Sequence, residues 1–166
     1  MPCVCVLRVR PTRRAGIAYA AISIADSQFN IITQNFMTDD CAHGVDIGAN
    51  VVDTTISLNH FQNNPGHGIF ESSTVGSNRN SYTDNKFDNT GGAAASLRQD
   101  WSSFSGNTIR QANLIQGRAG AAGATASAPR SAAAIEVAAG TSFVSIMNNK
   151  VTSPSQTGFP LMQTCT

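Results

Sequence analysis

A short pattern that recurs at nearly constant spacing constrains this chain more than any other feature. In each copy, a brief alternating strand precedes an amide residue, then one free residue, then a large apolar residue. The apolar positions lie 25, 26, 22 and 42 residues apart and are Phe36, Phe61, Phe87, Ile109 and Val151. The amide positions two residues earlier are Gln34, Asn59, Asn85, Asn107 and Asn149. Repeats of this length are typical of solenoid proteins.

A second apolar series runs in phase with the first. Its members are Val45, Ile69, Ala95 and Ile135, with spacings of 24, 26 and 40 residues. The segment Ile22-Ser23-Ile24 fits one unit earlier, and Phe159-Pro160-Leu161 fits one unit later. Each unit of about 24 residues therefore contains at least two short strands.

Two short strands cannot bury an apolar face alone, but units stacked on one another form a continuous core. A repeat of fixed length pairs equivalent strands in parallel, and parallel crossovers are almost always right-handed. The sequence thus predicts an all-β fold, a right-handed parallel β-helix of about five rungs, where a rung is one turn of the coil. Further core positions are expected at Phe29, Ile31, Ile56, Leu58, Tyr82, Trp101 and Phe104.

The column of amide side chains supports this fold independently. Like side chains stacked about 4.8 Å apart along a sheet form hydrogen-bonded amide ladders. Asn also tolerates the left-handed backbone that a sharp corner between two sheets requires. The repeated Asn is therefore expected to stabilise a corner of the coil, and it needs no role in chemistry.

The repeat also divides the chain. Residues 1–15 do not follow it and form an irregular N-terminal segment, whereas residues 16–166 are expected to form the β-helix. Residues 118–133 are rich in Gly, Ala and Ser and interrupt the period, which predicts a flexible loop leaving one corner. No capping helix is visible at either end, so the chain is expected to be a piece of a longer β-helix without complete caps.

Composition excludes several classes of protein. Charged residues make up 13% of the chain and the formal net charge is +1, which argues against a nucleic-acid-binding surface. No apolar run approaches the roughly 20 residues of a membrane span. The 4 cysteines show neither a Cys-x-x-Cys motif nor a zinc-like spacing, so free thiols are expected.

Polar and aromatic side chains gather on one predicted strand face. One residue after each member of the second series comes the outward row Ser23, Asp46, Phe70, Ser96 and Glu136. His43 and His67 stand three residues before Asp46 and Phe70, so the two imidazoles should stack on adjacent rungs. Arg98 lies two positions after Ser96. This face is the richest candidate for sugar contacts, with Phe70 as a stacking platform, or else it is a solvated strand surface.

The repeat resembles the pectate-lyase-like right-handed β-helix superfamily, as seen in Ile56-Ser57-Leu58-Asn59-His60-Phe61 followed by Gly66-His67-Gly68-Ile69. The resemblance covers about residues 16 to 165. It implies the β-helix fold, and it implies as possible functions the degradation of pectin, the epimerisation of mannuronan or a place in a phage tailspike.

Two short motifs are similar to those of polygalacturonases in that superfamily. They are Asp39-Asp40-Cys41 and Gly66-His67-Gly68. The resemblance implies that the aspartates activate water and protonate the leaving oxygen while His67 supports them. The chain departs from the family because the Asn-Thr-Asp and Arg-Ile-Lys motifs are missing. In the local 24-residue register, moreover, the tripeptide aligned with Gly66-His67-Gly68 is Ala42-His43-Gly44.

The sequence therefore predicts an extracellular or virion-surface β-helix that binds a polysaccharide, and it leaves open whether the chain also cleaves or epimerises the polymer. An enzyme of this kind would be a polysaccharide lyase, a glycoside hydrolase or an epimerase. The candidate catalytic residues are Asp40, Asp46 and His67. The candidate substrate-binding residues are His43, Phe70, Asp39 and Arg98.

The alternatives are a non-catalytic structural or adhesive solenoid, such as a surface-fibre or tail-fibre shaft, and an inactive fragment of a larger β-helix protein. Calcium needs clustered carboxylates, and a calcium-dependent lyase needs a basic residue beside them. Only Asp39, Asp40 and Asp46 cluster, with Arg98 two rungs away, so no cofactor or metal is expected. Neither nucleic acid nor a membrane is an expected partner, and a homotrimer is expected only in a phage spike.

Overall fold

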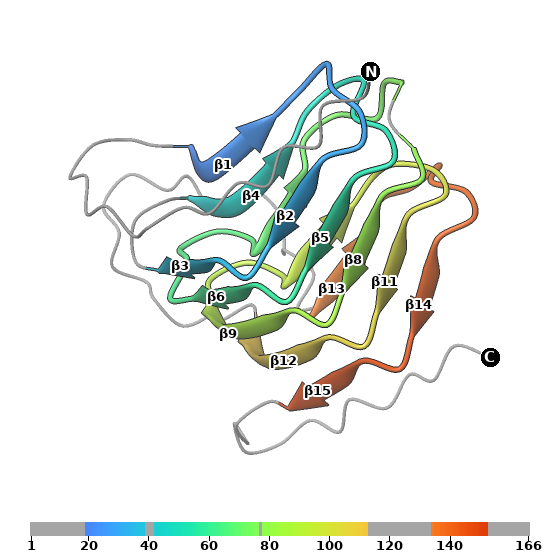
Figure 1. The fold of residues 1–166 in the computed structure, drawn as a ribbon. Coiled ribbons are helices and arrows are strands. Elements are labelled where there is room, and N and C mark those ends of the chain that lie inside the picture. Colours follow the sequence, from blue (N-terminus) through green and yellow to red (C-terminus); the bar gives the residue numbers. More distant parts are fainter. Residues whose placement is uncertain (1–18, 39–41, 77, 113–133, 153–166) are drawn as a thin grey trace, which may run out of the picture.

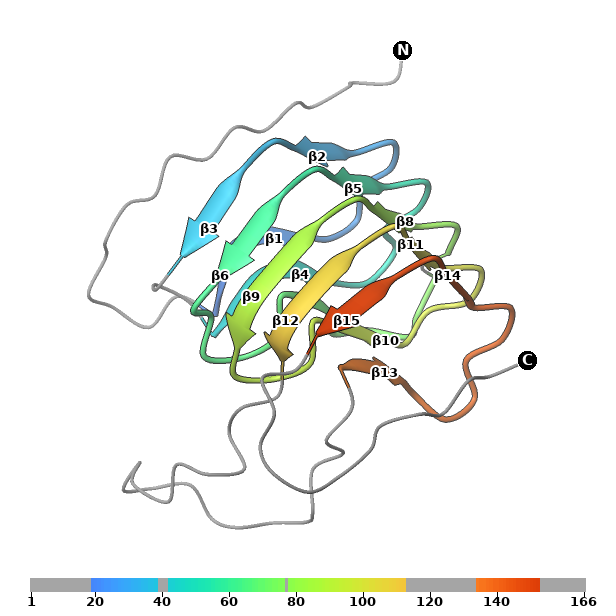
Figure 2. The same cartoon turned by 90° about the horizontal axis from the view of Figure 1, so that it is seen from below.

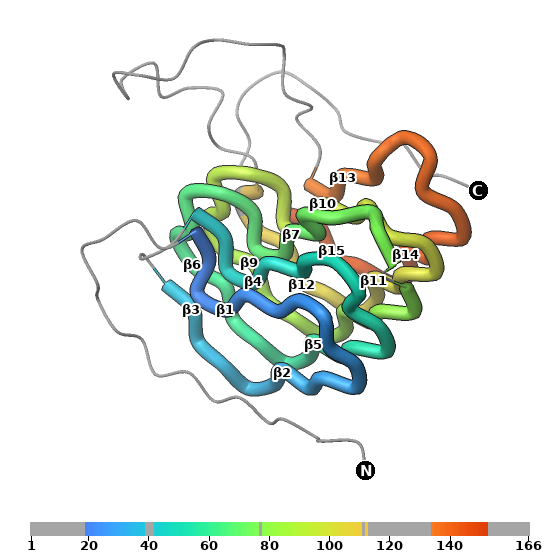
Figure 3. Tube along the Cα trace, turned by 90° about the horizontal axis from the view of Figure 1, so that it is seen from above, coloured from blue at the N-terminus to red at the C-terminus, as the bar shows by residue number. Residues whose placement is uncertain are grey.

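Three parallel sheets wound into one coil make up the described part of the chain. The computed structural model describes residues 19–38, 42–76, 78–112 and 134–152. Fifteen short strands occur in these ranges, which contain no helix. The chain visits the three sheets in turn and then repeats the circuit, as the tube in Figure 3 shows.

Each sheet takes one strand from every rung, and all pairings are parallel. The β1 sheet contains β1 (Ala20–Ile24), β4 (His43–Ile47), β7 (Ile69–Glu71), β10 (Ala95–Leu97) and β13 (Ile135–Val137). The β2 sheet, in front in Figure 1, contains β2 (Ile31–Thr33), β5 (Thr55–Ser57), β8 (Ser81–Thr83), β11 (Ser103–Ser105) and β14 (Ser145–Met147). The β3 sheet contains β3 (Phe36–Thr38), β6 (His60–Gln62), β9 (Lys86–Thr90), β12 (Thr108–Ala112) and β15 (Lys150–Thr152). Figure 2 shows these five strands lying side by side.

The register of the β1 sheet agrees with the second apolar series. Val45 pairs with Ile22 on one side and with Ile69 on the other. Ala95 then pairs with Ile69 and with Ile135. The strand after the long insertion therefore returns to the expected position, and the prediction for this sheet is confirmed.

The core is made of columns of apolar side chains that run along the coil. In the β3 sheet, the rings of Phe61 and Phe87 are stacked, with centroids 4.8 Å apart and planes 6° apart. The β2 sheet contributes the buried side chains of Ile32, Ile56, Tyr82 and Phe104. Stacking like on like buries each ring against the next rung, which is how a rung of two dozen residues acquires a core.

The sequence placed the first rung one residue out of register. Met37, not Phe36, pairs with Phe61, and Met37 is 3% exposed whereas Phe36 is 41% exposed. The amide column correspondingly begins at Asn35 and not at Gln34. Phe36 instead packs edge-on against His60 on the outer surface, with ring centroids 4.9 Å apart. Both Phe36 and Met37 are apolar, so hydrophobicity alone does not distinguish the two registers.

The predicted asparagine ladder is present, and every rung contributes to it. Its members are Asn35, Asn59, Asn85, Asn107 and Asn149. Each of the first four side-chain amides donates to the carbonyl oxygen of the next Asn at 3.0 to 3.2 Å. Each of those oxygens also accepts the backbone N–H of the previous Asn, as Asn107 does from Asn85 at 2.8 Å. The ladder therefore satisfies backbone groups as well as its own amides.

The sequence predicted that the ladder Asn would have the left-handed backbone at this corner. In the structure, the residue before the Asn has it instead. The φ angles are 58° at Gln34, 57° at Leu58 and 54° at Asp84. This geometry turns Leu58 outward, so it is 56% exposed and not part of the core. The same correction applies at the next corner to Phe29 and Trp101, which also have positive φ and are 47% and 56% exposed.

Three predicted segments, residues 1–15, 118–133 and 159–166, lie outside the described residues. The described part of the chain contains no helix that is long and apolar enough to cross a membrane.

Candidate functional site

The outer face of the β1 sheet carries the predicted row of side chains in the predicted order. Ser23 pairs with Asp46, and Asp46 pairs with Phe70 on the following strand. Phe70 pairs with Ser96, which in turn pairs with Glu136. Five successive rungs thus present Ser, Asp, Phe, Ser and Glu side chains along one line.

Next to this row, three rings form a stack. The imidazoles of His43 and His67 lie 5.3 Å apart with their planes 9° apart, so the predicted stacking is confirmed. The Phe70 ring is nearly parallel to both, at 4.5 Å from His43 and 5.1 Å from His67. Tyr19, which the sequence did not indicate, packs its ring edge-on against His43 and Phe70.

Glycines explain how the imidazoles fit between rungs. A Cβ added at Gly66 would lie 2.0 Å from the Ala42 carbonyl oxygen and 2.8 Å from the His43 ring. A Cβ at Gly92 would lie 2.8 Å from the His67 ring. On the inner side, a Cβ at Gly68 would meet the Phe87 ring at 2.4 Å. Packing alone therefore accounts for both glycines of Gly66-His67-Gly68, whatever the histidine does.

His43 is held in one tautomer and in its neutral form. Its Nδ1 accepts the backbone N–H of His67 at 3.1 Å, so the proton of the neutral ring belongs on Nε2. Burial, and after it the neighbouring His67, lower the pKa of His43 to about 4, although Asp46 acts in the opposite direction. At neutral pH, His43 is thus a hydrogen-bond donor through Nε2.

Asp46 combines burial with an unused hydrogen-bonding position. Its side chain lies on β4 and the residue is only 7% exposed. Oδ2 accepts the Ser23 hydroxyl at 3.1 Å, but Oδ1 is buried and has no hydrogen-bond partner. A buried acceptor without a donor costs about 1–3 kcal/mol, which a ligand that donates to it would recover.

Arg98 stands two rungs further along the same face. Its guanidinium carbon lies 4.9 Å from the centre of the Phe70 ring. His43 comes from the rung before Phe70, and Arg98 comes from the rung after it. The Phe70 ring is therefore contacted from both neighbouring rungs along the coil. The buried Nε of Arg98 has no hydrogen-bond partner. This face therefore offers one unused acceptor and one unused donor, with an aromatic stack between their rungs.

The comparisons with known proteins bear on the fold. Residues 12–166 match the family model described as a right-handed β-helix region. The chain belongs to this family. Searches of curated proteins and of solved structures found no match. The family match and the three parallel sheets together confirm the expected right-handed β-helix.

Inside this right-handed β-helix, Glu71 pairs with Ile47 of the previous rung and occupies the same inward position. It is fully buried, yet each of its carboxylate oxygens accepts two hydrogen bonds. The donors are the Tyr82 hydroxyl at 2.6 Å, the Ser102 hydroxyl at 2.9 Å, the Gln99 N–H at 2.7 Å and the Arg98 N–H. Burial raises the pKa of Glu71, and these hydrogen bonds oppose the rise. Glu71 has no opening to the outer face and acts as an internal anchor.

The β-helix brings five of the seven predicted site residues to one face. His43, Asp46, His67, Phe70 and Arg98 all lie there, whereas Asp39 and Asp40 fall outside the described residues. The described part of the chain contains no group of three or more His, Cys, Asp or Glu side chains able to hold a metal ion. Tyr19 was missed because it lies one position before the first strand, where the repeat gives no signal.

Proposed function

We propose that this β-helix works outside the cell or on a virion surface and binds a polysaccharide on the outer face of its β1 sheet. The observation that carries the proposal is the pair of unused polar groups, Asp46 Oδ1 and Arg98 Nε, both buried and without a hydrogen-bond partner. A sugar that displaces the side chains covering these two atoms supplies what each of them lacks, because a hydroxyl group both donates and accepts hydrogen bonds.

The surroundings of these two groups fit a carbohydrate. The ring edges of His43, His67 and Phe70 give the face an apolar body, and the Nε2–H of His43 adds a further donor. Sites of this kind, largely apolar with a few directed polar groups, are typical of ligand pockets. Nucleic acid is a poor alternative, because a net charge of +1 provides no basic stripe.

The pectate-lyase-like resemblance extends the proposal to chemistry. Asp46 is the carboxylate best placed to exchange a proton with a bound sugar, since it lies in the outward row and its Oδ1, once a side-chain movement exposes it, has no other partner. His43 is a weak base at neutral pH and serves in binding. Asp39, Asp40 and His67 remain predicted members of the site, and the proposal needs no cofactor.

A non-catalytic shaft is the second candidate, and one observation favours it. The rings of His43, His67 and Phe70 stack on one another, and the glycines beside them are explained by this packing. Such a ladder stabilises a solenoid without any ligand. The two candidates differ in what they predict for the unused oxygen of Asp46.

The test is an array of neutral and acidic polysaccharides, assayed for binding and for new reducing or unsaturated ends. Wild-type protein should bind at least one of them. Asp46→Asn and Arg98→Gln should each weaken that binding about tenfold to a hundredfold, the loss expected when a charged hydrogen bond worth about 1.5–3 kcal/mol disappears. Asp84→Asn makes the same charge change at an exposed corner on another sheet and is the matched control.

The enzyme and the binding protein separate in the same experiment. If Asp46→Asn also abolishes the release of new ends, Asp46 is an acid or base. If no polysaccharide binds, or if both variants bind as wild type does, the proposed site is rejected and the shaft is favoured.

A further inference from the structure

A second column of outward side chains lies at the corner between the β1 and β2 sheets. Each rung contributes one residue with a left-handed backbone, and the φ angles range from 54° to 60°. The members are Phe29, Asp53, Arg79, Trp101 and Phe143. Isolated parallel bridges join the neighbouring positions Gln28, Val52, Asn78 and Asp100, so the column is in register along the coil.

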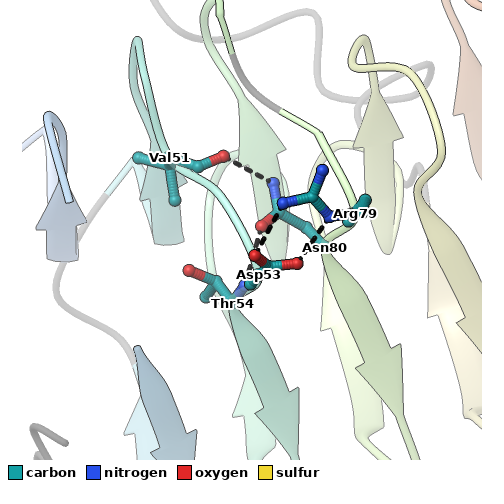
Figure 4. Close-up of polar contacts among 5 residues, drawn as sticks. All are labelled: Val51, Asp53, Thr54, Arg79 and Asn80. Carbon is teal, nitrogen blue, oxygen red and sulfur yellow. Dashed lines mark hydrogen bonds and ion pairs between the residues drawn. The ribbon is translucent and has the colours of Figure 1, made fainter. Parts of the chain in front are cut away.

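Hydrogen bonds from inside the coil hold this corner in place. Asn80 accepts the backbone N–H of Thr54 at 3.0 Å and donates to the carbonyl oxygen of Val51 at 3.2 Å (Figure 4). In the same view, Arg79 and Asp53 lie side by side on the corner. The outward side chains are thus displayed on an anchored backbone, as a preorganised binding surface requires.

Local stability does not explain the large residues in this column. A bulky side chain with positive φ is unusual, and such a conformation costs about 1–3 kcal/mol. Burial does not offset this cost, because Phe29, Trp101 and Phe143 are 47%, 56% and 68% exposed. At the Asn-ladder corner, the same conformation is occupied by Asp84 and Gly106, which tolerate it better, but also by Leu58. What distinguishes the corner column is that three of its five strained, outward side chains are aromatic and exposed, and this points to a function.

The column is arranged in two pairs. The rings of Trp101 and Phe143 are stacked, with centroids 4.1 Å apart and planes 12° apart. The Arg79 side chain points away from Trp101 and towards Asp53 on the previous rung, to which it donates two hydrogen bonds of 2.7 Å each. The face of Trp101 that is turned away from Phe143 therefore looks towards the Asp53–Arg79 pair. The guanidinium has five N–H donors, so Arg79 keeps donors beyond the two that Asp53 uses.

We propose that this corner column is a second carbohydrate-binding surface, separate from the β1-sheet face and suited to a neutral polysaccharide. The apolar face of a sugar ring packs on Trp101, and the remaining donors of Arg79 and the oxygens of Asp53 bind its hydroxyl groups.

Charge is the reason for choosing a neutral carbohydrate. An aromatic platform also stacks on nucleic-acid bases, but such sites need an excess of positive charge to follow the phosphates. Here Asp53 cancels Arg79, and Asp100 lies beside Trp101. A purely apolar protein partner would have to bury this ion pair, which costs more than it returns. A ligand with an apolar face and many uncharged hydroxyls meets neither obstacle.

Trp101 makes the proposal directly measurable, because the protein contains 1 tryptophan. The experiment titrates wild-type protein with cellohexaose, laminarihexaose and mannohexaose while recording the tryptophan emission. At least one of these neutral hexasaccharides should change the emission in a saturable way. Arg79→Gln and Phe143→Ala should each raise the apparent Kd about tenfold or more.

Leu58→Ala is the matched control. Leu58 is also 56% exposed and has φ of 57°, but it lies at the Asn-ladder corner, so its loss should leave the titration unchanged. Circular dichroism of each variant checks that the coil is intact, and Trp101→Phe, followed by calorimetry, should retain part of the affinity. The inference is overturned if no hexasaccharide changes the emission. It is equally overturned if Asp46→Asn, and not Arg79→Gln, removes the response, since the ligand then sits on the β1 sheet.

Discussion

Glu71 shows how a single residue can depart from the repeat without breaking it. Its position is equivalent to Ile47 on the previous rung, and both side chains point into the coil. A buried carboxylate is costly unless its oxygens are hydrogen-bonded. Glu71 meets this condition with four donors, two of them backbone N–H groups at the shortened corner that follows β10.

Glu71→Gln should therefore destabilise the fold although the two side chains have the same shape. An amide has only one oxygen, so its NH2 group would face either two N–H donors or two hydroxyls that now donate to the carboxylate. We expect a loss of about 1–3 kcal/mol in the free energy of unfolding, measured by urea denaturation. Glu136→Gln, on the outer face of β13, is the control and should change stability little. Equal effects of the two substitutions would contradict the anchoring role.

His43 should give the fold a sensitivity to acid. In the unfolded chain its pKa is near the ordinary 6.5, whereas in the folded protein it is about 4. Between these values the unfolded chain takes up a proton that the folded protein refuses, so stability falls as the pH decreases from about 6.5 to about 4. NMR of the imidazole signals should show His43 titrating near pH 4 in native protein and near 6.5 in urea. A native midpoint near 6.5 would show that His43 is solvated and not packed in the stack.

Among the structural elements, the asparagine ladder joins the rungs most directly. Asn85→Ala removes the two bonds that the Asn85 amide donates and leaves the backbone N–H of Asn59 without its acceptor. We expect a loss of about 2–4 kcal/mol in the free energy of unfolding, since each buried unsatisfied group costs about 1–3 kcal/mol. Asn149→Ala should cost less, because the ladder as described ends there and Asn149 is less buried. Similar costs at both positions would show that the ladder is not cooperative.

The periodicity of the strands was readable in the sequence, but the corner geometry was not. The β1 sheet register follows from the regular spacing of Val45, Ile69 and Ala95, and Val45 has no apolar neighbour in sequence that competes for the inward position. On the first rung, Phe36 and Met37 do compete, and the repeat pattern favours Phe36 although Met37 is the inward residue. Left-handed residues turn their side chains outward whatever their hydrophobicity, so Leu58 and Trp101 read as core residues although they are exposed.

The candidate site was predictable to a similar degree. Simple alternation placed Asp46 and Phe70 in one outward row, and the equal spacing of His43 and His67 predicted their stack. The unused oxygen of Asp46 was not predictable, because it depends on which side chain reaches which atom across rungs. The corner column repeats with the same spacings as the asparagine ladder, which would have identified it as a column, but its chemistry varies from rung to rung.

At the scale of the whole molecule, the long insertion should be dispensable for the fold. Deleting residues 118–133 leaves six residues between β12 and β13, the same number that joins β6 to β7. The pairing of Ala95 with Ile135 can then form as before. We expect the melting temperature to change by no more than a few degrees in differential scanning calorimetry. A much larger drop would show that the insertion packs on the coil.

The three sheets present three different outer faces, and this allows the proposed polysaccharide site to be located without any mutation. The protein has 3 histidines. His43 and His67 lie on the β1-sheet face, whereas His60 lies on the β3 sheet and pairs with Asp88 at 2.8 Å. The histidines therefore report on two separate faces of the same molecule.

The most direct test is a titration with the polysaccharide fragment that binds best, followed through the imidazole signals in NMR spectra. Binding at the proposed site should shift the signals of His43 and His67 in a saturable way and leave those of His60 unchanged. A ligand that binds while His43 and His67 keep their free-state signals, or one that shifts His60 instead, would contradict the assignment of the polysaccharide site to the β1 sheet.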